Sequence, residues 1–504
     1  MFNKILIANR GEIAVRIIRA CREMGIRTVA VYSEADRDAL HTQLADEAVC
    51  IGKAQSSDSY LNMERILSAT IATKAEAIHP GFGFLSENSR FVEMCEKCNV
   101  AFIGPSAEVI SRMGNKSEAK NTMRKAKVPV VPGTKEPVYT VEQALEAVKE
   151  IGFPVMIKAS AGGGGKGMRV AGNEQEFAKL FETAQQESVH SFSDNTMYLE
   201  RFVENPRHVE VQILADKYGN VVHLGERDCS VQRRHQKMIE ESPCIAISDD
   251  LRKKMGETAV RAAKAAGYES AGTIEFLLDQ SGEFYFMEMN TRIQVEHPVT
   301  EECTGVDLVR DMILVAAGNR LPYHQEDIEF RGAAIECRIY AEDPENNFMP
   351  SPGVITVREA PEGRNVRLDS AAYAGFEVSL HYDPMIAKLC CWGRNRASAI
   401  SNMARALREY KILGIKTTIP FHQRVLKNAA FLKGEYDTTF IDTRFDKEDL
   451  KRRQNTDPTV AVIAAALKHF EKEKEAASRA TTLPVVGESL WKYYGKLQMT
   501  ANNY

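Results

Sequence analysis

The chain of 504 residues contains no apolar run long enough to cross a bilayer as a helix, which takes about 20 residues. It also lacks an excess of charge of one sign, because 65 Lys and Arg residues are matched by 69 Asp and Glu residues. Neither nucleic acid nor a membrane surface is therefore expected as the principal partner. With 44% hydrophobic residues, the composition excludes intrinsic disorder and is typical of a globular protein with several domains.

Cysteine pairs at metal-ligand spacing are almost absent. Among the 10 cysteines, Cys95 and Cys98 form the one C-x-x-C, and no second pair accompanies it. We therefore expect reduced thiols in a cytoplasmic protein, with a zinc or redox role of this pair as the alternative.

Two glycine fingerprints of nucleotide-binding proteins are missing as well. Residues 9–11, after the first strand, lack the G-x-G-x-x-G pattern, and residues 81–83 lack its third glycine. The glycine run 162–167 is not a P-loop, because Ser160 and Gly167 stand where that motif requires glycine and a hydroxyl residue. A dinucleotide site and a Walker-type site are therefore both disfavoured.

What the chain does contain is a regular succession of strand and helix patterns. Apolar strands alternate with helix-period segments in the first part, which predicts a small α/β domain on a parallel sheet. The last part is charged, and Asp457-Pro458 predicts the start of a helix that either caps the preceding domain or docks a partner. The predicted organisation is an α/β domain over 1–115, a second unit over 116–330, an α+β unit over 331–446 and a helical extension over 447–504.

The glycine run is predicted to form the tip of a hairpin, since short strand patterns precede and follow it. Backbone N–H groups of consecutive glycines can wrap a polyphosphate, because the chain approaches closely without a Cβ atom. Lys158, at the end of the preceding strand, and Lys116 are candidate counter-charges. A merely flexible loop is the alternative.

A predicted strand pair over 272–290 places two carboxylates opposite each other. If its loop is Ser281-Gly282, Glu275 lies opposite Glu288, and Asn290 shares their face. Facing carboxylates repel, and their oxygens suit Mg²⁺ or Mn²⁺ rather than zinc. A shared proton, solvent access, or a register wrong by one residue are the alternatives.

The segment directly after this pair carries Arg292, Gln294 and Glu296, which point one way if the chain is extended. Arginine can hold a planar oxyanion in two hydrogen bonds, the amide can orient it, and the carboxylate can take its proton, so bicarbonate fits. A salt-bridged strand is the alternative. A basic cluster over 232–237 is either a solvated surface or a second anion site, and Arg338 alone indicates nothing beyond structure.

Taken together, these motifs resemble those of biotin carboxylases in the ATP-grasp superfamily. The resemblance covers residues 1 to about 446 and rests on residues 7–14, 79–88, 162–167, 227–237 and 288–298. It implies an N-terminal Rossmann-like domain, an ATP-grasp domain with a mobile lid over about 131–203, and a C-terminal biotin carboxylase domain.

The resemblance also implies roles for individual residues. ATP would contact Lys116, Lys158, Gly163, Gly164, Gly165, Glu200, Val203, His208, Gln232 and His235. Bicarbonate would contact Lys237, Arg292, Gln294, Val295 and Glu296, and biotin would contact Phe82 and Arg338. Mg²⁺ or Mn²⁺ would be held by Glu275 and Glu288 with Asn290 nearby, and the catalytic residues would be Glu296, Arg338, Lys237 and Arg292.

In the reaction that the resemblance implies, Glu296 deprotonates bicarbonate, which attacks the γ-phosphate of ATP and forms carboxyphosphate. No lysine lies between two methionines, so biotin is expected on another chain, a biotin carboxyl carrier protein working with a carboxyltransferase subunit. The resemblance also implies that the chain forms a homodimer. The acceptor stays open between acetyl-CoA, another acyl-CoA and pyruvate. The alternative functions are another ATP-grasp ligase of bicarbonate or a carboxylate, and a catalytically silent nucleotide-binding subunit.

Overall fold

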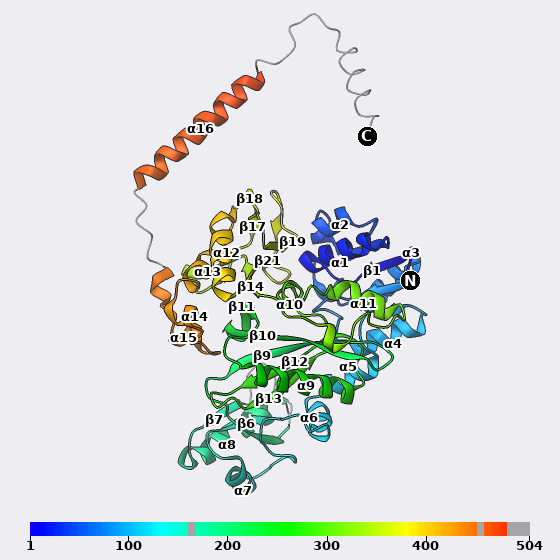
Figure 1. Ribbon diagram of the computed structural model, residues 1–504, viewed down its shortest axis with the longest axis vertical. Coiled ribbons are helices and arrows are strands. Elements are labelled where there is room, and N and C mark those ends of the chain that lie inside the picture. The colour runs from blue at the N-terminus through cyan, green and yellow to red at the C-terminus, as the bar shows by residue number, and fades with distance from the viewer. Residues whose placement is uncertain (160–167, 193, 451–457, 481–504) are drawn as a thin grey trace, which may run out of the picture. The chain divides into compact units, whose positions relative to one another are not determined.

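The computed structural model describes residues 1–159, 168–192, 194–450 and 458–480 (Figure 1). The N-terminal part is a parallel five-stranded sheet in the order β3-β2-β1-β4-β5. Alternate residues of its first strand pack against helices on opposite faces, which explains why the strand is apolar throughout. Its elements are β1 (Lys4–Ile7), α1 (Gly11–Glu23), β2 (Arg27–Ser33), η1 (Glu34–Asp36), α2 (Leu40–Leu44), β3 (Glu47–Gly52), η2 (Ser56–Asp58), α3 (Met63–Thr73), β4 (Ala77–His79), α4 (Ser89–Lys97), β5 (Ala101–Phe102) and α5 (Ala107–Gly114).

A small antiparallel sheet in the order β7-β6-β8 forms a lobe with two helices, at the lower end of Figure 1. Phe177 and Phe181 of its longer helix pack on Ile157 and Leu199 of the sheet. The glycine run lies outside the described residues, but the two strands beside it pair antiparallel, as a hairpin requires. The elements of this part are α6 (Lys116–Lys125), α7 (Val141–Ile151), β6 (Val155–Ala159), β7 (Met168–Ala171), α8 (Glu174–Phe192) and β8 (Met197–Arg201).

The largest sheet has eight strands in the order β13-β12-β9-β10-β11-β14-β21-β19. A helix over 249–266 packs on this sheet; it begins after the N-cap Ser248 and ends at Gly267, whose φ of 60° is left-handed. The elements are β9 (Arg207–Ala215), β10 (Val221–Arg233), β11 (Gln236–Ser242), α9 (Asp249–Ala266), β12 (Ser270–Leu278), β13 (Phe284–Asn290), α10 (His297–Thr304), α11 (Leu308–Ala316) and η3 (Gln325–Asp327).

The same sheet continues into the C-terminal part, because β14 pairs antiparallel with β11 and with β21. Strands on both sides of the predicted boundary between residues 330 and 331, β11 before it and β14 after it, are therefore hydrogen-bonded neighbours in one sheet. The remaining elements are β14 (Ala333–Tyr340), β15 (Glu342–Asp343), η4 (Pro344–Asn346), β16 (Met349–Pro350), β17 (Gly353–Val354), β18 (Val357–Glu359), β19 (Val366–Ser370), β20 (Glu377–Val378), β21 (Met385–Gly393), α12 (Arg396–Glu409), β22 (Lys411–Leu413), α13 (Ile419–Val425), α14 (Ala429–Lys433), α15 (Phe440–Thr443) and η5 (Lys447–Leu450).

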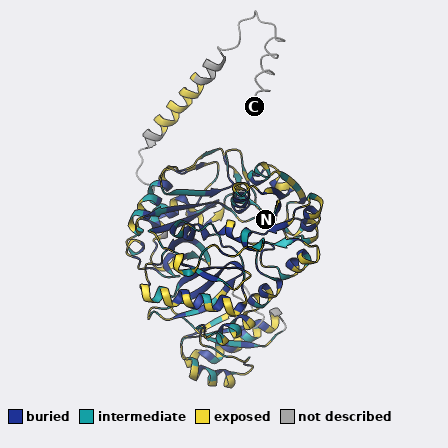
Figure 2. Cartoon of the chain, turned by 45° about the vertical axis from the view of Figure 1, so that its right-hand side comes forward, coloured by how far each residue is buried: buried dark blue, intermediate teal, exposed yellow. Residues whose placement is uncertain are grey.

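The chain divides into two compact units, residues 1–447 and 448–504. Buried residues are concentrated in the sheets of the first unit (Figure 2). The second unit contains α16 (Pro458–Ala480), on which Ile463, Leu467 and Phe470 are exposed. No described helix combines the length and the apolarity that a membrane span requires.

His79, at the end of β4, makes stability depend on acid pH. Burial, followed by the charge of Arg16, lowers the pKa of this imidazole to about 3. Between pH 6.5 and 3 the unfolded chain binds a proton at this histidine more readily than the folded chain does. The contribution of His79 to the free energy of unfolding is therefore fully present above pH 6.5, the ordinary pKa, and is lost as the pH falls toward 3. His79→Asn keeps an acceptor for the Gly81 N–H, which donates to Nδ1. We expect calorimetric melting temperatures to fall less steeply for this variant between pH 6.5 and 4; equal slopes would contradict the prediction.

Candidate active site

Three carboxylates and a guanidinium lie in one row across four neighbouring strands. Glu275 of β12 pairs with Glu288 of β13 on one side and with Glu210 of β9 on the other, and Glu210 pairs with Arg227 of β10. Like charges directly opposite each other destabilise a sheet unless cations compensate them. The row therefore marks a place where positive charge is required.

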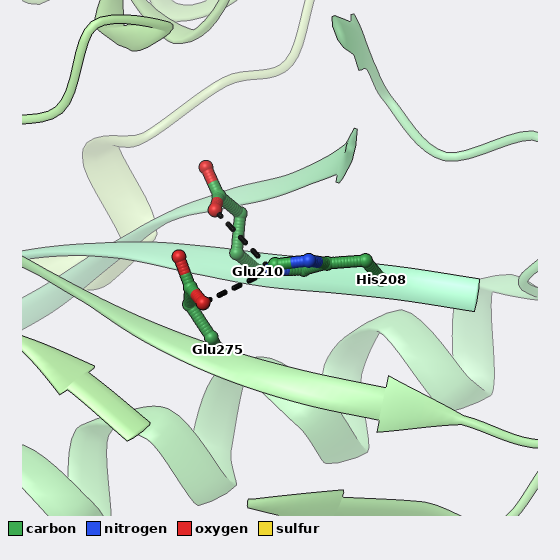
Figure 3. A group of neighbouring side chains, drawn as sticks. All are labelled: His208, Glu210 and Glu275. Carbon is green, nitrogen blue, oxygen red and sulfur yellow. Dashed lines mark ion pairs between the residues drawn. The ribbon is translucent and has the colours of Figure 1, made fainter. Parts of the chain in front are cut away.

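Lys237 of β11 supplies much of that charge. Its Nζ donates to Glu210 Oε2 at 2.6 Å, to Glu275 Oε1 at 3.0 Å and to Glu296 Oε1 at 2.7 Å. His208 lies beside the same carboxylates, and its Nε2 is 3.1 Å from Glu275 Oε2 and 3.9 Å from Glu210 Oε2 (Figure 3). One ammonium thus joins carboxylates from two strands and a loop.

Mutual charge sets the protonation of this cluster. Burial lowers the pKa of Lys237, but the three carboxylates outweigh burial and raise it well above its usual value. Burial raises the pKa of Glu296, yet Lys237 and Arg338 hold it well below the usual range. The pKa of Glu275 is likewise lowered, because Lys237 and His208 outweigh burial. Both carboxylates are therefore ionised, and Glu296 can accept a proton.

The segment 291–296 is not the extended strand predicted from the alternation of its residues. It is an irregular loop that ends where α10 begins at His297, and Pro298 lies in the first turn of that helix. Gln294 and Glu296 still reach the cluster: the Gln294 amide donates to Glu275 Oε1 at 2.9 Å. Arg292 instead turns aside and donates to Glu87 Oε2 and to Asn290 Oδ1, both at 2.9 Å.

Arg338 of β14 enters the cluster from the C-terminal part of the chain. Its Nη2 donates to Glu296 Oε2 at 2.9 Å, and its Nε donates to Glu240 Oε1 at 2.5 Å. Burial and the negative charge of Glu296 raise the pKa of Glu240 to about 7, although the positive charge of Arg338 opposes this rise. The guanidinium is therefore held between the carboxylates of Glu240 and Glu296.

A second group lies on the small sheet. Glu200 of β8 forms ion pairs with both Lys158 of β6 and Lys120 of α6. Within the described part of the chain, no side-chain hydrogen bond or ion pair joins the other predicted nucleotide and biotin residues to the Lys237 cluster, although Gln232 lies directly opposite Lys237 where β10 pairs with β11. Lys116 begins α6, Val203 follows β8, Gln232 lies near the end of β10, His235 lies in the turn to β11, and Phe82 lies in the loop after β4; Gly163, Gly164 and Gly165 lie outside the described residues.

The hairpin register is the predicted one at the carboxylates but not near the turn. Glu275 lies opposite Glu288, whereas Phe276 lies opposite Phe286, one residue off the predicted register. The loop has three residues rather than two, since the Asp279 N–H donates to the Glu283 carbonyl oxygen. A bulge at Met287 of β13 compensates for the longer loop.

The donor set on this hairpin fits a hard divalent cation. Burial, followed by the negative charge of Glu275, raises the pKa of Glu288. The Oδ1 of the buried Asn290 accepts from Arg292 Nη2 at 2.9 Å, so this amide oxygen already has a cation beside it. Carboxylate and amide oxygens are the ligands that Mg²⁺ and Mn²⁺ prefer, and a cation between Glu275 and Glu288 would relieve their repulsion.

Comparison with known proteins places this geometry in a family. Residues 1–110 and 336–443 match the models described as the N-terminal and C-terminal domains of biotin carboxylase, and residues 115–324 match the ATP-binding domain of the carbamoyl-phosphate synthase L chain. Biotin carboxylase 1 of Bacillus subtilis is 57% identical over 444 residues, 88% of this chain and 99% of that protein. The chain belongs to the biotin carboxylase family. Its activity is the ATP-dependent carboxylation of biotin.

Other biotin carboxylases agree in length and fold. A pyruvate carboxylase subunit of Methanothermobacter thermautotrophicus is 52% identical over 483 residues, 93% of this chain and 98% of that protein. The biotin carboxylase domain dimer of Hydrogenobacter thermophilus 2-oxoglutarate carboxylase, in complex with MgADP, ADP and bicarbonate, gives a TM-score of 0.81 at 49% identity and covers 88% of this chain and 99% of that one. The predicted ATP-grasp architecture is confirmed.

Several residues of this biotin carboxylase site escaped the sequence interpretation. Glu210 lies two residues from His208 on β9, so the strand period alone could have placed both on one face. Arg227 is fully buried and donates to Glu210 Oε1 at 2.6 Å and to Gln294 Oε1 at 2.9 Å. Nothing local in the sequence distinguishes it from a surface arginine. Glu87, Lys120 and Glu240 are the other members that were missed.

Proposed function

We propose that the Lys237 cluster is the place where bicarbonate is activated. The observation that carries this proposal is the joint contact of Lys237 and Arg338 with the two oxygens of Glu296. A small oxyanion beside Glu296 would receive donors from Lys237 and from the Val295 backbone, with Gln294 orienting it and Arg292 turning in from Glu87. Glu296, which is ionised, would take the proton and leave a nucleophilic oxygen.

ATP is proposed to bind between the small sheet and the Lys237 cluster. Lys158 and Lys116 would neutralise its phosphates, and the glycine run would cover them as part of a lid over about 131–203. Closure would exclude water from the unstable carboxyphosphate. The further contacts proposed are Gly163, Gly164, Gly165, Glu200, Val203, His208, Gln232 and His235.

Glu275 and Glu288 are the proposed ligands of Mg²⁺ or Mn²⁺, with Asn290 close by. A divalent ion there would offset charge on the phosphates while bicarbonate attacks. This chain's own part is to keep Glu275 ionised opposite Glu288 on the hairpin. His208 and Lys237 do so for Glu275, whose pKa they lower.

Biotin is proposed to reach Arg338 and Phe82 on a carrier protein, since a biotin carboxylase subunit works with a biotin-carrying partner. Arg338 would stabilise the enolate form of its ureido group. A carboxyltransferase subunit would then receive the carboxyl group, and the chain would act as a homodimer. We place it in the cytoplasm, because all ten cysteines are free and most are buried.

The acceptor of the carboxyl group is proposed to be pyruvate rather than acetyl-CoA. The alignment with the Methanothermobacter pyruvate carboxylase subunit extends over 483 residues, against 444 for biotin carboxylase 1, so it includes more of the C-terminal extension. Assays of the carboxylated carrier with its partner subunit and either pyruvate or acetyl-CoA distinguish the two acceptors.

ADP release from MgATP tests the proposed function, with bicarbonate and free biotin omitted in turn. Turnover that requires bicarbonate and rises with biotin is expected. Turnover that needs bicarbonate but ignores biotin would favour another ATP-grasp ligase of bicarbonate or a carboxylate. Absence of turnover, also with the biotinylated carrier, would favour a silent nucleotide-binding subunit.

Glu288→Gln tests the proposed metal site. The variant keeps the side-chain size but weakens one ligand, so the Mg²⁺ concentration at half-maximal ADP release should rise at least about tenfold. Glu283→Gln, on the exposed loop of the same hairpin, is the matched control and should leave the Mg²⁺ requirement unchanged. Equal Mg²⁺ requirements of both variants would remove Glu288 from the metal site.

A further inference from the structure

Lys388 of β21 is a fully buried lysine outside the proposed substrate contacts. Its side chain has 0% exposure, and its Nζ donates to the Val295 carbonyl oxygen at 2.6 Å. The same Nζ lies 3.3 Å from Glu12 Oε1 and 3.9 Å from Asp369 Oδ2. A buried ammonium is retained only where partners compensate its desolvation, so its contacts indicate a specific task.

The position of Lys388 in the sheet is itself unfavourable. It lies directly opposite Arg338 on β14, so two cations share one cross-strand position. Arg338 is neutralised by Glu240 and Glu296, while Lys388 has Asp369 opposite it on β19 and Glu12 from α1. The two cations are thus held apart by separate anions, and only Lys388 binds the loop backbone.

Glu12 depends on Lys388 in return. Both of its carboxylate oxygens are buried without a hydrogen-bond partner in the described part of the chain. Burial raises the pKa of Glu12 to about 7, and Lys388 is the group that most opposes this rise. The first turn of α1 is therefore linked through Lys388 to Val295, between the two loop residues Gln294 and Glu296.

We propose that Lys388 is a positioning residue for the bicarbonate loop 294–296, and that Glu12 of α1 and Asp369 of β19 hold its ammonium in place. The inference rests on the proposed roles of Gln294 and Glu296. By fixing the carbonyl between them, Lys388 orients the backbone at Val295 and the side chain of Glu296 toward Lys237. Displacing reacting groups by about 1 Å costs about a hundredfold in rate.

Lys388→Met tests the proposal, because methionine fills the space of the stem without donating a hydrogen bond. Bicarbonate-dependent ADP release should show kcat lowered or KM for bicarbonate raised by about tenfold to a hundredfold. KM for ATP and the calorimetric affinity for ADP should stay unchanged, since neither uses the loop. A variant that only lost stability would keep the wild-type KM values for bicarbonate and ATP and the wild-type affinity for ADP.

Lys4→Met is the matched control. Lys4 is also a buried lysine; its Nζ donates to the Thr73 carbonyl oxygen at 2.6 Å and to Glu47 Oε1 at 2.6 Å, far from the loop. Its variant should melt at a lower temperature but retain kcat and both KM values. If Lys388→Met changes only the melting temperature, as the control does, the proposal is overturned.

Glu12→Gln keeps the test decisive if Lys388→Met does not fold. The amide preserves size and leaves Lys388 with Val295 and Asp369, so a smaller change of about threefold to tenfold in the same bicarbonate parameters is expected. Normal bicarbonate kinetics would overturn the proposal. The wild-type chain separates the two hypotheses: if it shows no bicarbonate-dependent turnover, the proposed function fails, whereas a normal variant beside an active wild type refutes only the role of Lys388.

Discussion

Glu296→Gln should lower kcat for bicarbonate-dependent ADP release by about 10³-fold, within the range of a lost general base. Glutamine has nearly the same shape, and its amide oxygen can still accept from either Lys237 or Arg338, which contact the two oxygens of Glu296 at 2.7 and 2.9 Å. It cannot take a proton from bicarbonate. Steady-state ADP release at saturating ATP measures kcat, and ADP affinity measured by calorimetry should remain within about twofold, because nucleotide binding does not use this carboxylate.

Glu241→Gln provides the matched control for that variant. Glu241 is also a buried glutamate with an ion pair, to Arg396 at 2.5 Å, but it faces away from the cluster, toward α12. Its loss should reduce stability without reducing kcat. Retention of wild-type kcat by Glu296→Gln would show that bicarbonate is deprotonated elsewhere, whereas an equal loss in both variants would indicate a general effect of removing buried charge.

Lys237→Met should abolish turnover and also lower stability by about 3–5 kcal/mol, the cost of leaving a buried ion pair without its partner. Glu210, Glu275 and Glu296 would then face one another without the ammonium that they share. Chemical denaturation at pH 8 measures the loss. The double variant Lys237→Met/Glu210→Gln removes one negative charge together with the positive one and should recover part of it.

The stability loss of Lys237→Met should also depend on pH in a defined direction. In the wild type the pKa values of Glu275 and Glu296 lie below the ordinary 4.5, so their stabilisation is present above pH 4.5 and is lost as the pH falls. Without Lys237 these pKa values rise. The difference between wild type and variant should therefore be largest at neutral pH and shrink below pH 5. A constant difference would show that Lys237 acts through packing.

The hairpin shows how far the sequence can predict such a site. The assumed loop Ser281-Gly282 placed Glu275 opposite Glu288, and the structure contains that pairing. The predicted loop length was wrong by one residue, and the bulge at Met287 cancelled that error at the carboxylates. Short loops of two and three residues are both compatible with Ser281-Gly282, so the correct pairing depended partly on compensation.

Residues brought in by other strands were beyond sequence reasoning. Arg227, Glu240 and Lys388 become part of the site only through the strand order β12-β9-β10-β11-β14-β21, which no local pattern encodes. The loop 291–296 shows the opposite limit, because its polar alternation resembled a strand, whereas the structure has a loop there and α10 begins at His297. The alternation grouped Gln294 with Glu296, and both side chains contact the Lys237 cluster, but from a loop rather than from a strand.

The pairing of β11 with β14 has a consequence for dividing the chain. A cut in the connection between α11 and β14 would give two fragments, each with a newly exposed apolar strand edge. Those edges are complementary from Ile239 opposite Cys337 to Ser242 opposite Ala334. Arg338 would be on one fragment and Glu296 on the other, so catalysis would return only when the halves reassociate. The fold thus supplies a split enzyme whose activity reports the proximity of two proteins fused to its halves.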